Sequence, residues 1–272
     1  MLGILDKMYT QLLSGEVYYQ LPVGNEKVDL NPLIGQSIKF KYTGRIICLE
    51  CQKLTKKSFN QGFCYSCFTK LAQCDMCIMK PETCHFAAGT CRDPQWGEEF
   101  CFQPHYIYLA NSSGIKVGIT RHTQVPTRWI DQGAVQALPI FKVSSRKLSG
   151  LIEVIFAKHI SDKTSWQQML KGKSAQIDLV TRRDELVQTC QNALNELLQV
   201  YDSTDIILLN DESVLDITFP VLKYPLKVKS LNLDKDPEVT GILQGIKGQY
   251  LLLDIGVINI RKYTGYEIDF SV

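Results

Sequence analysis

Nine of the ten cysteines lie between Cys48 and Cys101, and their spacing constrains the fold more than any other feature of the chain. The pairs Cys48-x2-Cys51 and Cys64-x2-Cys67 place four thiols on two tight turns. Four thiolates arranged in this way are a usual ligand set for one tetrahedral structural Zn²⁺. Disulfides are the alternative, but the amino terminus lacks a secretion signal and cytosolic thiols stay reduced. The spacing therefore predicts a zinc ribbon.

Five further cysteines follow within this stretch, together with one histidine, which is more ligands than one site needs. We predict a second zinc on four of them, because three of the four lie in turn-rich stretches. The Cys74-x2-Cys77 spacing, and the position of His85 beside Cys84, leave open that Cys74 or His85 replaces one ligand. Closed four-ligand sites are structural, so neither zinc is expected to be catalytic. The predicted second set is Cys77, Cys84, Cys91 and Cys101.

Charge is unevenly distributed along the chain, although the formal net charge is only +2. Residues 101–173 contain ten lysines or arginines against three carboxylates, whereas residues 184–238 contain eleven carboxylates against four lysines. An anionic partner would meet the basic middle. With 272 residues and 45% hydrophobic composition, two or three small globular domains are expected. No apolar run reaches the roughly 18 residues of a membrane span, so we expect a cytoplasmic protein with no membrane partner.

Short strands are predicted near both ends of the chain. Residues 17–21 and 38–42 alternate apolar and polar side chains, which is typical of half-buried strands, whereas residues 1–13 predict a short helix or an irregular start. After a helix over 175–200, six short strands between 206 and 260 are separated by Gly, Pro or Asp. We predict a small terminal β-barrel or curled sheet. The amino-terminal strands are expected to complete it, with the zinc module as an insertion.

The residues between the cysteines and the 175–200 helix predict five elements in the order strand, strand, helix, strand, helix. Strands are expected over 104–110 and 115–120 around a turn, and a third over 136–143; helices are expected from Thr127 and over 149–160. The fold class is α+β. Four segments are expected: an amino-terminal β segment (1–47), a zinc-binding module with two sites (48–101), the five-element domain (102–174), and a helix plus β-rich domain (175–272).

This order of elements resembles the GIY-YIG nuclease superfamily over part of the five-element domain. Tyr106-Ile107-Tyr108 stands where the first motif would be, and Lys116-Val117-Gly118 stands where the second would be. Arg128 and Glu153 match the superfamily arginine and the metal-binding glutamate. The resemblance implies catalytic roles for Tyr108, Lys116, Arg128 and Glu153, with Mg²⁺ or Mn²⁺ at Glu153. Tyr106 replaces the usual glycine and Lys116 the usual tyrosine, which leaves open whether the core is an active, weakened or inactive nuclease.

Nearly everything from Cys48 onward also resembles a bacterial zinc-binding family known as domain of unknown function 2797. The similar stretches are Gly89-Thr90-Cys91-Arg92, the run from Lys116 to Arg121, and the run from Arg128 to Ala134. This second resemblance names a family but implies no function.

Aromatic and basic side chains occur together around these motifs, because Tyr106 and Trp129 lie near Lys116, Arg121 and Arg128 in the predicted fold. This mixture is typical of a platform on which unpaired bases stack, although a core position is the alternative for Trp129. Lys116 suits phosphate binding better than base catalysis, because lysine is protonated at neutral pH. The leading hypothesis is a nucleic-acid-binding protein, with RNA slightly favoured; the alternative is a non-enzymatic zinc scaffold that binds a protein partner.

Overall fold

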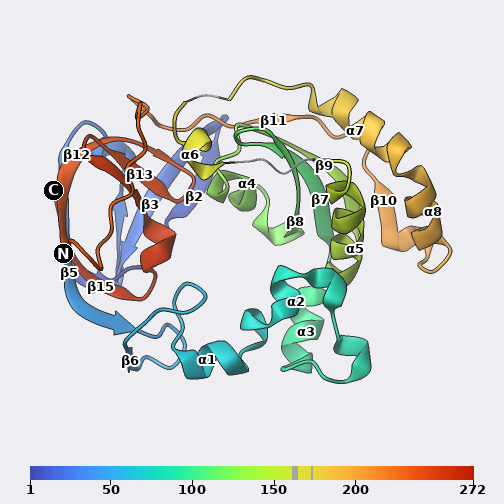
Figure 1. The fold of residues 1–272 in the computed structure, drawn as a ribbon, viewed down its shortest axis with the longest axis horizontal. Helices are drawn as coiled ribbons and strands as arrows, with labels where there is room; N and C mark the ends of the chain where they lie inside the picture. Colours follow the sequence, from blue (N-terminus) through green and yellow to red (C-terminus); the bar gives the residue numbers. More distant parts are fainter. Residues whose placement is uncertain (161–164, 173) are drawn as a thin grey trace.

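The computed structural model describes residues 1–160, 165–172 and 174–272. Figure 1 shows two sheet-rich bodies, with the cysteine-rich residues 48–101 running between them along one side. The two ends of the chain meet in the first body, where the Met1 amino group donates a 2.8 Å hydrogen bond to the carbonyl oxygen of Phe270. Of the basic middle, Asp162, Lys163 and Lys173 lie outside the described residues. None of the described helices has the length and apolar character needed to cross a bilayer.

The first body contains a terminal sheet built from both ends of the chain. Strand β5 lies between β12 and β15, so an amino-terminal strand completes the carboxyl-terminal sheet, as predicted. The sheet is open, with β1 and β14 at the ends of the described pairing order, so of the two predicted alternatives the barrel is wrong and a sheet is observed. The order is β1 (Leu2–Ile4), β15 (Tyr266–Ser271), β5 (Ser37–Ile47), β12 (Glu238–Lys247), β13 (Tyr250–Leu253) and β14 (Gly256–Asn259), with β6 (Leu54–Thr55) paired to β5.

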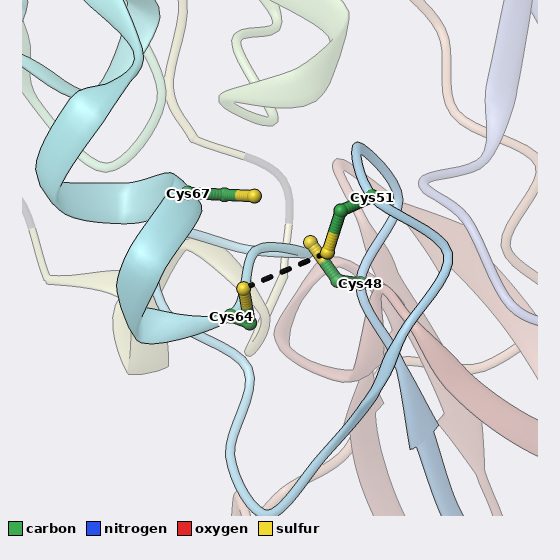
Figure 2. Close-up of side chains that lie close together, drawn as sticks. All are labelled: Cys48, Cys51, Cys64 and Cys67. Carbon is green, nitrogen blue, oxygen red and sulfur yellow. Dashed lines mark hydrogen bonds between the residues drawn. The ribbon is translucent and has the colours of Figure 1, made fainter.

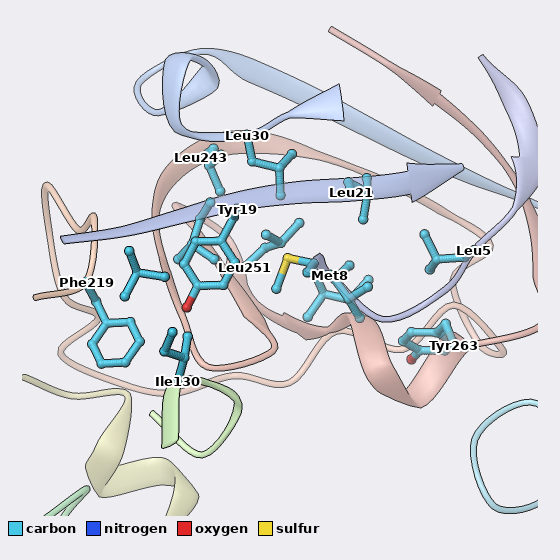
Figure 3. Close-up of a cluster of buried hydrophobic side chains, with 14 of the residues drawn as sticks. Leu5, Met8, Tyr19, Leu21, Leu30, Ile130, Phe219, Leu243, Leu251 and Tyr263 are labelled. Atoms are coloured by element: carbon cyan, nitrogen blue, oxygen red, sulfur yellow. The ribbon is translucent and has the colours of Figure 1, made fainter. Parts of the chain in front are cut away.

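A separate three-stranded sheet covers the terminal sheet and closes its hydrophobic core. It consists of β2 (Tyr9–Leu13), β3 (Glu16–Val23) and β4 (Glu26–Asp29), so strands replace the helix or irregular start expected for residues 1–13. Along β3, buried and exposed side chains alternate with period two. Figure 3 shows Tyr19 and Leu21 of β3 in a cluster with Leu243 and Leu251 of the terminal sheet. Two packed sheets therefore bury the core of the first body.

The second body contains the five elements in the predicted order: β7 (His105–Asn111), β8 (Ile115–Arg121), α4 (Thr127–Asp131), β9 (Gln136–Val143) and α5 (Arg146–Ala157). The sheet order is β10-β9-β7-β8. Helix α5 begins after Ser145, whose side chain accepts a hydrogen bond from the Leu148 backbone N–H. It buries Ile152 and Phe156 against Ile107 and Leu109 of β7.

The helical segment after residue 175 packs on the second body rather than on the terminal sheet. The expected single helix is two helices, α7 (Leu179–Thr189) and α8 (Gln191–Leu198), separated at Cys190. The strands that follow, β10 (Ile206–Leu208) and β11 (Leu215–Asp216), both pair with β9. Arg183 helps to fix this arrangement, because its buried guanidinium donates to the carbonyl oxygens of Leu209 and Asn210. Helices α7 and α8 and strands β10 and β11 therefore belong to the second body.

Residues 48–101 connect the two bodies and form short helices and turns. None of the three hydrophobic clusters found among the described residues includes a side chain from this stretch. A segment without an apolar core of its own needs another source of folding energy, and metal binding supplies it in small domains. Its elements after β6 are α1 (Tyr65–Lys70), α2 (Met76–Met79) and α3 (Pro94–Cys101), with 3-10 turns at Ala72–Cys74, Pro81–Thr83 and Phe86–Ala88; helix α6 (Trp166–Met169) lies later, between the two bodies.

Candidate functional site

The two predicted cysteine pairs meet at one point, which Figure 2 shows. The sulfur atoms of Cys48, Cys51, Cys64 and Cys67 all lie within 4.8 Å of one another. The Cys51 and Cys64 sulfurs are 3.8 Å apart. With Zn–S bonds of about 2.3 Å, tetrahedral ligand sulfurs stand about 3.8 Å apart. The donor set and its geometry therefore fit one structural Zn²⁺.

Backbone turns position these four thiols and make Cys48 acidic. Cys48 follows β5, and the Leu49 N–H donates to the Gly62 carbonyl oxygen at 2.8 Å, which brings the two pairs together. Burial opposes ionisation of Cys48, but backbone N–H groups, including that of Cys51, lower its pKa to about 6. Burial and the neighbouring sulfurs raise the pKa of Cys67 to about 12. Four thiolates crowded in this way require a cation to neutralise them.

The four cysteines predicted for the second zinc line one small cavity, of about 20 Å³, on the other side of the module. This is enough space for a single ion or water molecule. The thiols interact electrostatically. Burial is the largest cause of the raised pKa of Cys77, and Cys84 and Cys101 both raise this pKa further. Their sulfurs do not form a compact group, however. The ligand atoms here that lie within 4.8 Å of one another belong to Asp75, Cys77 and His85.

The alternative ligands of the second site already have protein partners. The two ring nitrogens of His85 lie 2.8 Å from the Thr90 hydroxyl and 3.5 Å from the Asp75 carboxylate. Asp75 also pairs with Arg92 at 2.7 Å. These contacts make His85 and Asp75 better suited to orient the loop than to bind metal.

Cys74, the other alternative, accepts a hydrogen bond from the Asn60 amide at 3.3 Å and does not line the cavity. The four-cysteine set for the second site stays a prediction, because the compact group of donor atoms at this place consists of Asp75, Cys77 and His85.

The residues taken from the nuclease resemblance meet around Tyr108, which is fully buried on β7. Its hydroxyl donates a 3.0 Å hydrogen bond to the Gln132 side-chain oxygen. Gly118 pairs with Tyr108 across the hairpin, and a Cβ at this position would lie 2.7 Å from the tyrosine oxygen, so only glycine fits. Burial raises the pKa of Tyr108 to about 12; the Arg128 guanidinium opposes this rise and Glu153 adds to it. The phenol therefore stays protonated and acts as a hydrogen-bond donor.

Glu153 is partly buried on α5 and has an unusually high pKa for a carboxyl. Burial raises its pKa to about 6, Arg128 opposes the rise, and Glu82 of the cysteine module contributes to it. A carboxyl with this pKa can hold or release a proton near neutral pH. The structure thus brings Tyr108, Arg128 and Glu153 within electrostatic reach of one another.

The hairpin places Lys116 on the same sheet face as Tyr108, because Lys116 pairs with Ala110 and Gly118 pairs with Tyr108. This face belongs to the core of the first body, whereas α5 packs on the opposite face. Glu153 therefore approaches the site from the opposite face of the sheet, on a helix that runs close to the edge strand β8.

The predicted stacking platform is only partly present. Trp129 is 3% exposed and packs edge-on against Tyr108, with ring centroids 5.7 Å apart, so no base can stack on it; the alternative core position is the observed one. Tyr106 remains partly exposed. Arg121 lies with its guanidinium carbon 5.0 Å above the centre of the Phe100 ring, at the border with the cysteine module.

Helix α4 connects the two bodies through a residue that sequence reasoning did not single out as functional. The Asp131 side chain is 5% exposed, accepts a 2.8 Å hydrogen bond from the Gln249 amide, and lies 3.4 Å from Lys7 and 3.9 Å from Arg261. All three partners belong to the terminal body. In the sequence, this role of Asp131 was indicated only by its position inside the Arg128–Ala134 motif. Its partners could not be recognised, because they lie more than a hundred residues away along the chain.

A family model described as "Protein of unknown function (DUF2797)" matches residues 35–268. The chain belongs to this family. Searches of curated proteins and of solved structures found no match. The matched range runs from just before β5 into β15, so it includes the cysteine module, the second body and most of the terminal sheet, whereas β1 and the sheet β2–β4 lie outside it. The description assigns the DUF2797 family no activity, and any function must be argued from the site itself.

Proposed function

We propose that this DUF2797 protein is a zinc-containing nucleic-acid-binding protein, with RNA slightly favoured, whose second body binds phosphodiesters in the manner of a GIY-YIG-like core. The proposal depends on one observation. Several guanidinium groups converge beside Tyr108 and Glu153, and few carboxylates stand among them. Burial lowers the pKa of Arg146, the Cys101 and Cys77 sulfurs oppose this, and Arg121 and Arg128 each lower it further.

Buried arginines that repel one another cost folding free energy unless an anion or a polar partner offsets the repulsion. The protein supplies part of the compensation, since Arg146 donates a 2.6 Å hydrogen bond to the Ile78 carbonyl oxygen and Glu153 lies near Arg128. Two phosphates of a nucleic acid would supply the rest, because guanidinium groups bind phosphate oxygens in a bidentate way. Lys116 serves as a further phosphate contact on the hairpin.

Cleavage is a secondary part of this proposal and requires a divalent ion. Among the described residues, groups of three or more metal-binding side chains occur only at the two cysteine-containing sites, and Glu153 belongs to neither. Mg²⁺ or Mn²⁺ at Glu153 would need phosphate oxygens and water for its remaining ligands. The lysine at position 116, where the superfamily carries tyrosine, fits a core that binds more strongly than it cuts.

Binding is tested with labelled single-stranded RNA and DNA of one sequence, measured by fluorescence anisotropy at several salt concentrations. Arg128→Ala should weaken binding and reduce the slope of log affinity against log salt by about one, because each phosphate contact releases about one counterion. Lys39→Ala is the matched control, since Lys39 pairs with Glu238 on the terminal sheet at 2.6 Å. Equal slopes in the wild type and in both variants would favour the scaffold alternative.

Cleavage is tested separately by incubating the same oligonucleotides with Mg²⁺ or Mn²⁺. Glu153→Gln should abolish any cutting while leaving binding intact or stronger, because it removes a negative charge near the phosphate. Lys116→Tyr should lower affinity if Lys116 binds phosphate. If Lys116→Tyr instead raised metal-dependent cutting without loss of affinity, the lysine would mark a weakened nuclease and not a phosphate contact.

The scaffold alternative has one observation in its favour. Leu222 and Leu226, in the loop between β11 and β12, are 69% and 94% exposed. Apolar side chains exposed together can mark a surface that binds another protein. Under this alternative, Leu226→Ser should abolish capture of a protein partner, and the arginine substitutions should change nothing.

A further inference from the structure

A cleft lies where helix α3 of the cysteine module, the end of β8 and the first body meet, and none of the predicted nucleic-acid contacts except Arg121 lines it. Its volume of about 400 Å³ falls within the range of roughly 300–1,000 Å³ that is usual for ligand sites. We call it the α3–β8 cleft. The lining residues used in the argument are Lys7, Gln61, Trp96, Phe100, Arg121 and Arg261.

One wall of the cleft consists of planar side-chain groups that stack on one another in a row, which we call the ladder. Trp96 and Phe100 are four residues apart on α3, so their rings lie on one face of the helix. The rings are stacked, with centroids 4.9 Å apart and planes inclined by 22°. The Arg121 guanidinium lies over the Phe100 ring at 5.0 Å. Trp96 is partly exposed, so an unpaired base can extend the ladder by stacking on its indole.

The part of the lining that comes from the first body, which we call the cationic wall, presents cations in fixed positions. Arg261 donates a hydrogen bond to the Gln61 side-chain oxygen, and both Arg261 and Lys7 lie near the buried Asp131 carboxylate. These contacts use only some of their N–H donors, and a guanidinium carries five. Asp6 is the one carboxylate among the described residues that line the cleft, against three cations. The wall therefore favours an anionic ligand.

The cleft continues toward the site that carries the proposed function. Arg261, which lines the cleft, lies 3.9 Å from Asp131 on α4, and the same short helix carries Arg128 of the proposed site. Burial lowers the pKa of Arg261, Asp131 opposes this, and Arg128 lowers it further. Lys7, Arg261 and Arg128 thus lie around the Asp131 carboxylate, which takes up part of their positive charge. A duplex would have to unpair for a base to reach Trp96, whereas a single strand can place bases on the aromatic wall and phosphates on the cationic wall.

We propose that the α3–β8 cleft binds a single-stranded segment of nucleic acid and leads it to the Tyr108–Arg128 site, with one base stacked on Trp96 and the adjacent phosphates bound by Arg121 and Arg261. This inference rests on the proposed function, because it extends the same phosphodiester-binding surface. It adds a strand preference, an aromatic contact and a path that crosses from the cysteine module to the first body.

The test compares single-stranded RNA, single-stranded DNA and the corresponding duplexes with the full-length, zinc-loaded protein. Single strands should bind more tightly than duplex. Trp96→Ala should weaken single-strand binding by about 5- to 160-fold, because base–aromatic stacking contributes roughly 1–3 kcal/mol per base, and should leave duplex binding unchanged. The matched control is Trp166→Ala, because Trp166 is also exposed (42%) but stacks on Tyr250 outside the cleft.

The outcomes separate the two proposals. If the wild type binds none of the probes, the proposed function fails together with this inference. If the wild type binds and Arg128→Ala weakens binding, but Trp96→Ala behaves like Trp166→Ala, the proposed function stands and the cleft is not the path. Duplex binding equal to or tighter than single-strand binding would also overturn the inference. Circular dichroism and zinc content, unchanged in Trp96→Ala, exclude misfolding as the cause of weaker binding.

Discussion

The two groups of four cysteines in the module, each a predicted zinc site, differ in what surrounds them. The first gathers four sulfurs within 4.8 Å of one another on two local turns. The second spreads four cysteines around a cavity, and its loop packs on α5 of the second body. Arg146 at the start of α5 donates to the Ile78 carbonyl oxygen of the module. The first cluster therefore stabilises a local ribbon, whereas the second also positions the helix that carries Glu153.

The largest effect is expected from breaking the first cluster. Cys48→Ser should remove one zinc and unfold the ribbon, because metal binding to such sites provides on the order of 10 kcal/mol. Zinc analysis of the purified protein should fall from about two ions per chain to about one, and thermal unfolding should shift to much lower temperature. Unchanged zinc content in Cys48→Ser would rule out the first site.

Breaking the second cluster is expected to cost less stability but to affect residues outside the cysteine module. Cys101→Ser should remove the other zinc and leave the ribbon folded, while hydrogen exchange in α5 speeds up because the loop no longer holds it. His85→Ala is the matched control and should keep two zinc ions, since both ring nitrogens already have protein partners. Loss of a zinc in His85→Ala but not in Cys101→Ser would replace the four-cysteine set.

The contact between the second cluster and α5 can be changed without touching a metal ligand. A Cβ at Gly150 would lie 2.7 Å from the backbone nitrogen of Glu82 and from Pro81, whereas a Cβ at Gly172 would meet nothing within 4 Å. Gly150→Ala should therefore destabilise the protein by about 1–3 kcal/mol through overpacking, and Gly172→Ala should not. Equal denaturant midpoints for the two variants would show that the loop is not seated on α5.

The smallest expected effect is electrostatic and involves the same contact. The pKa of Glu153 is raised to about 6 by burial, with Glu82 contributing. A raised folded-state pKa means that the folded protein binds a proton more tightly than the unfolded chain, so stability falls as pH rises from about 4.5 to 6. Glu153→Gln should remove this dependence and stabilise the protein at pH 7 by about 1 kcal/mol. Denaturation curves at pH 4.5 and pH 7 check it, and a pH dependence as steep as in the wild type would contradict it.

The sequence by itself determined the features that depend on short-range spacing. The two cysteine pairs predicted one site because two turns twelve residues apart can meet without help from the rest of the chain. The five-element order of the second body was predictable because its strands and helices show their periodicity locally. Gly118 matched a motif, and the structure adds the reason, which is its close approach to the Tyr108 ring.

Only the tertiary structure decided which distant segments pack together. An open terminal sheet covered by β2–β4, instead of a closed barrel, results from long-range pairing that alternation along each strand does not specify. The Arg128–Ala134 motif shows the same limit: it places Arg128 at the site, Trp129 in the core and Asp131 against Lys7 and Arg261. Neighbouring residues on a short helix point in different directions, and what each one meets depends on chain that arrives from the other body.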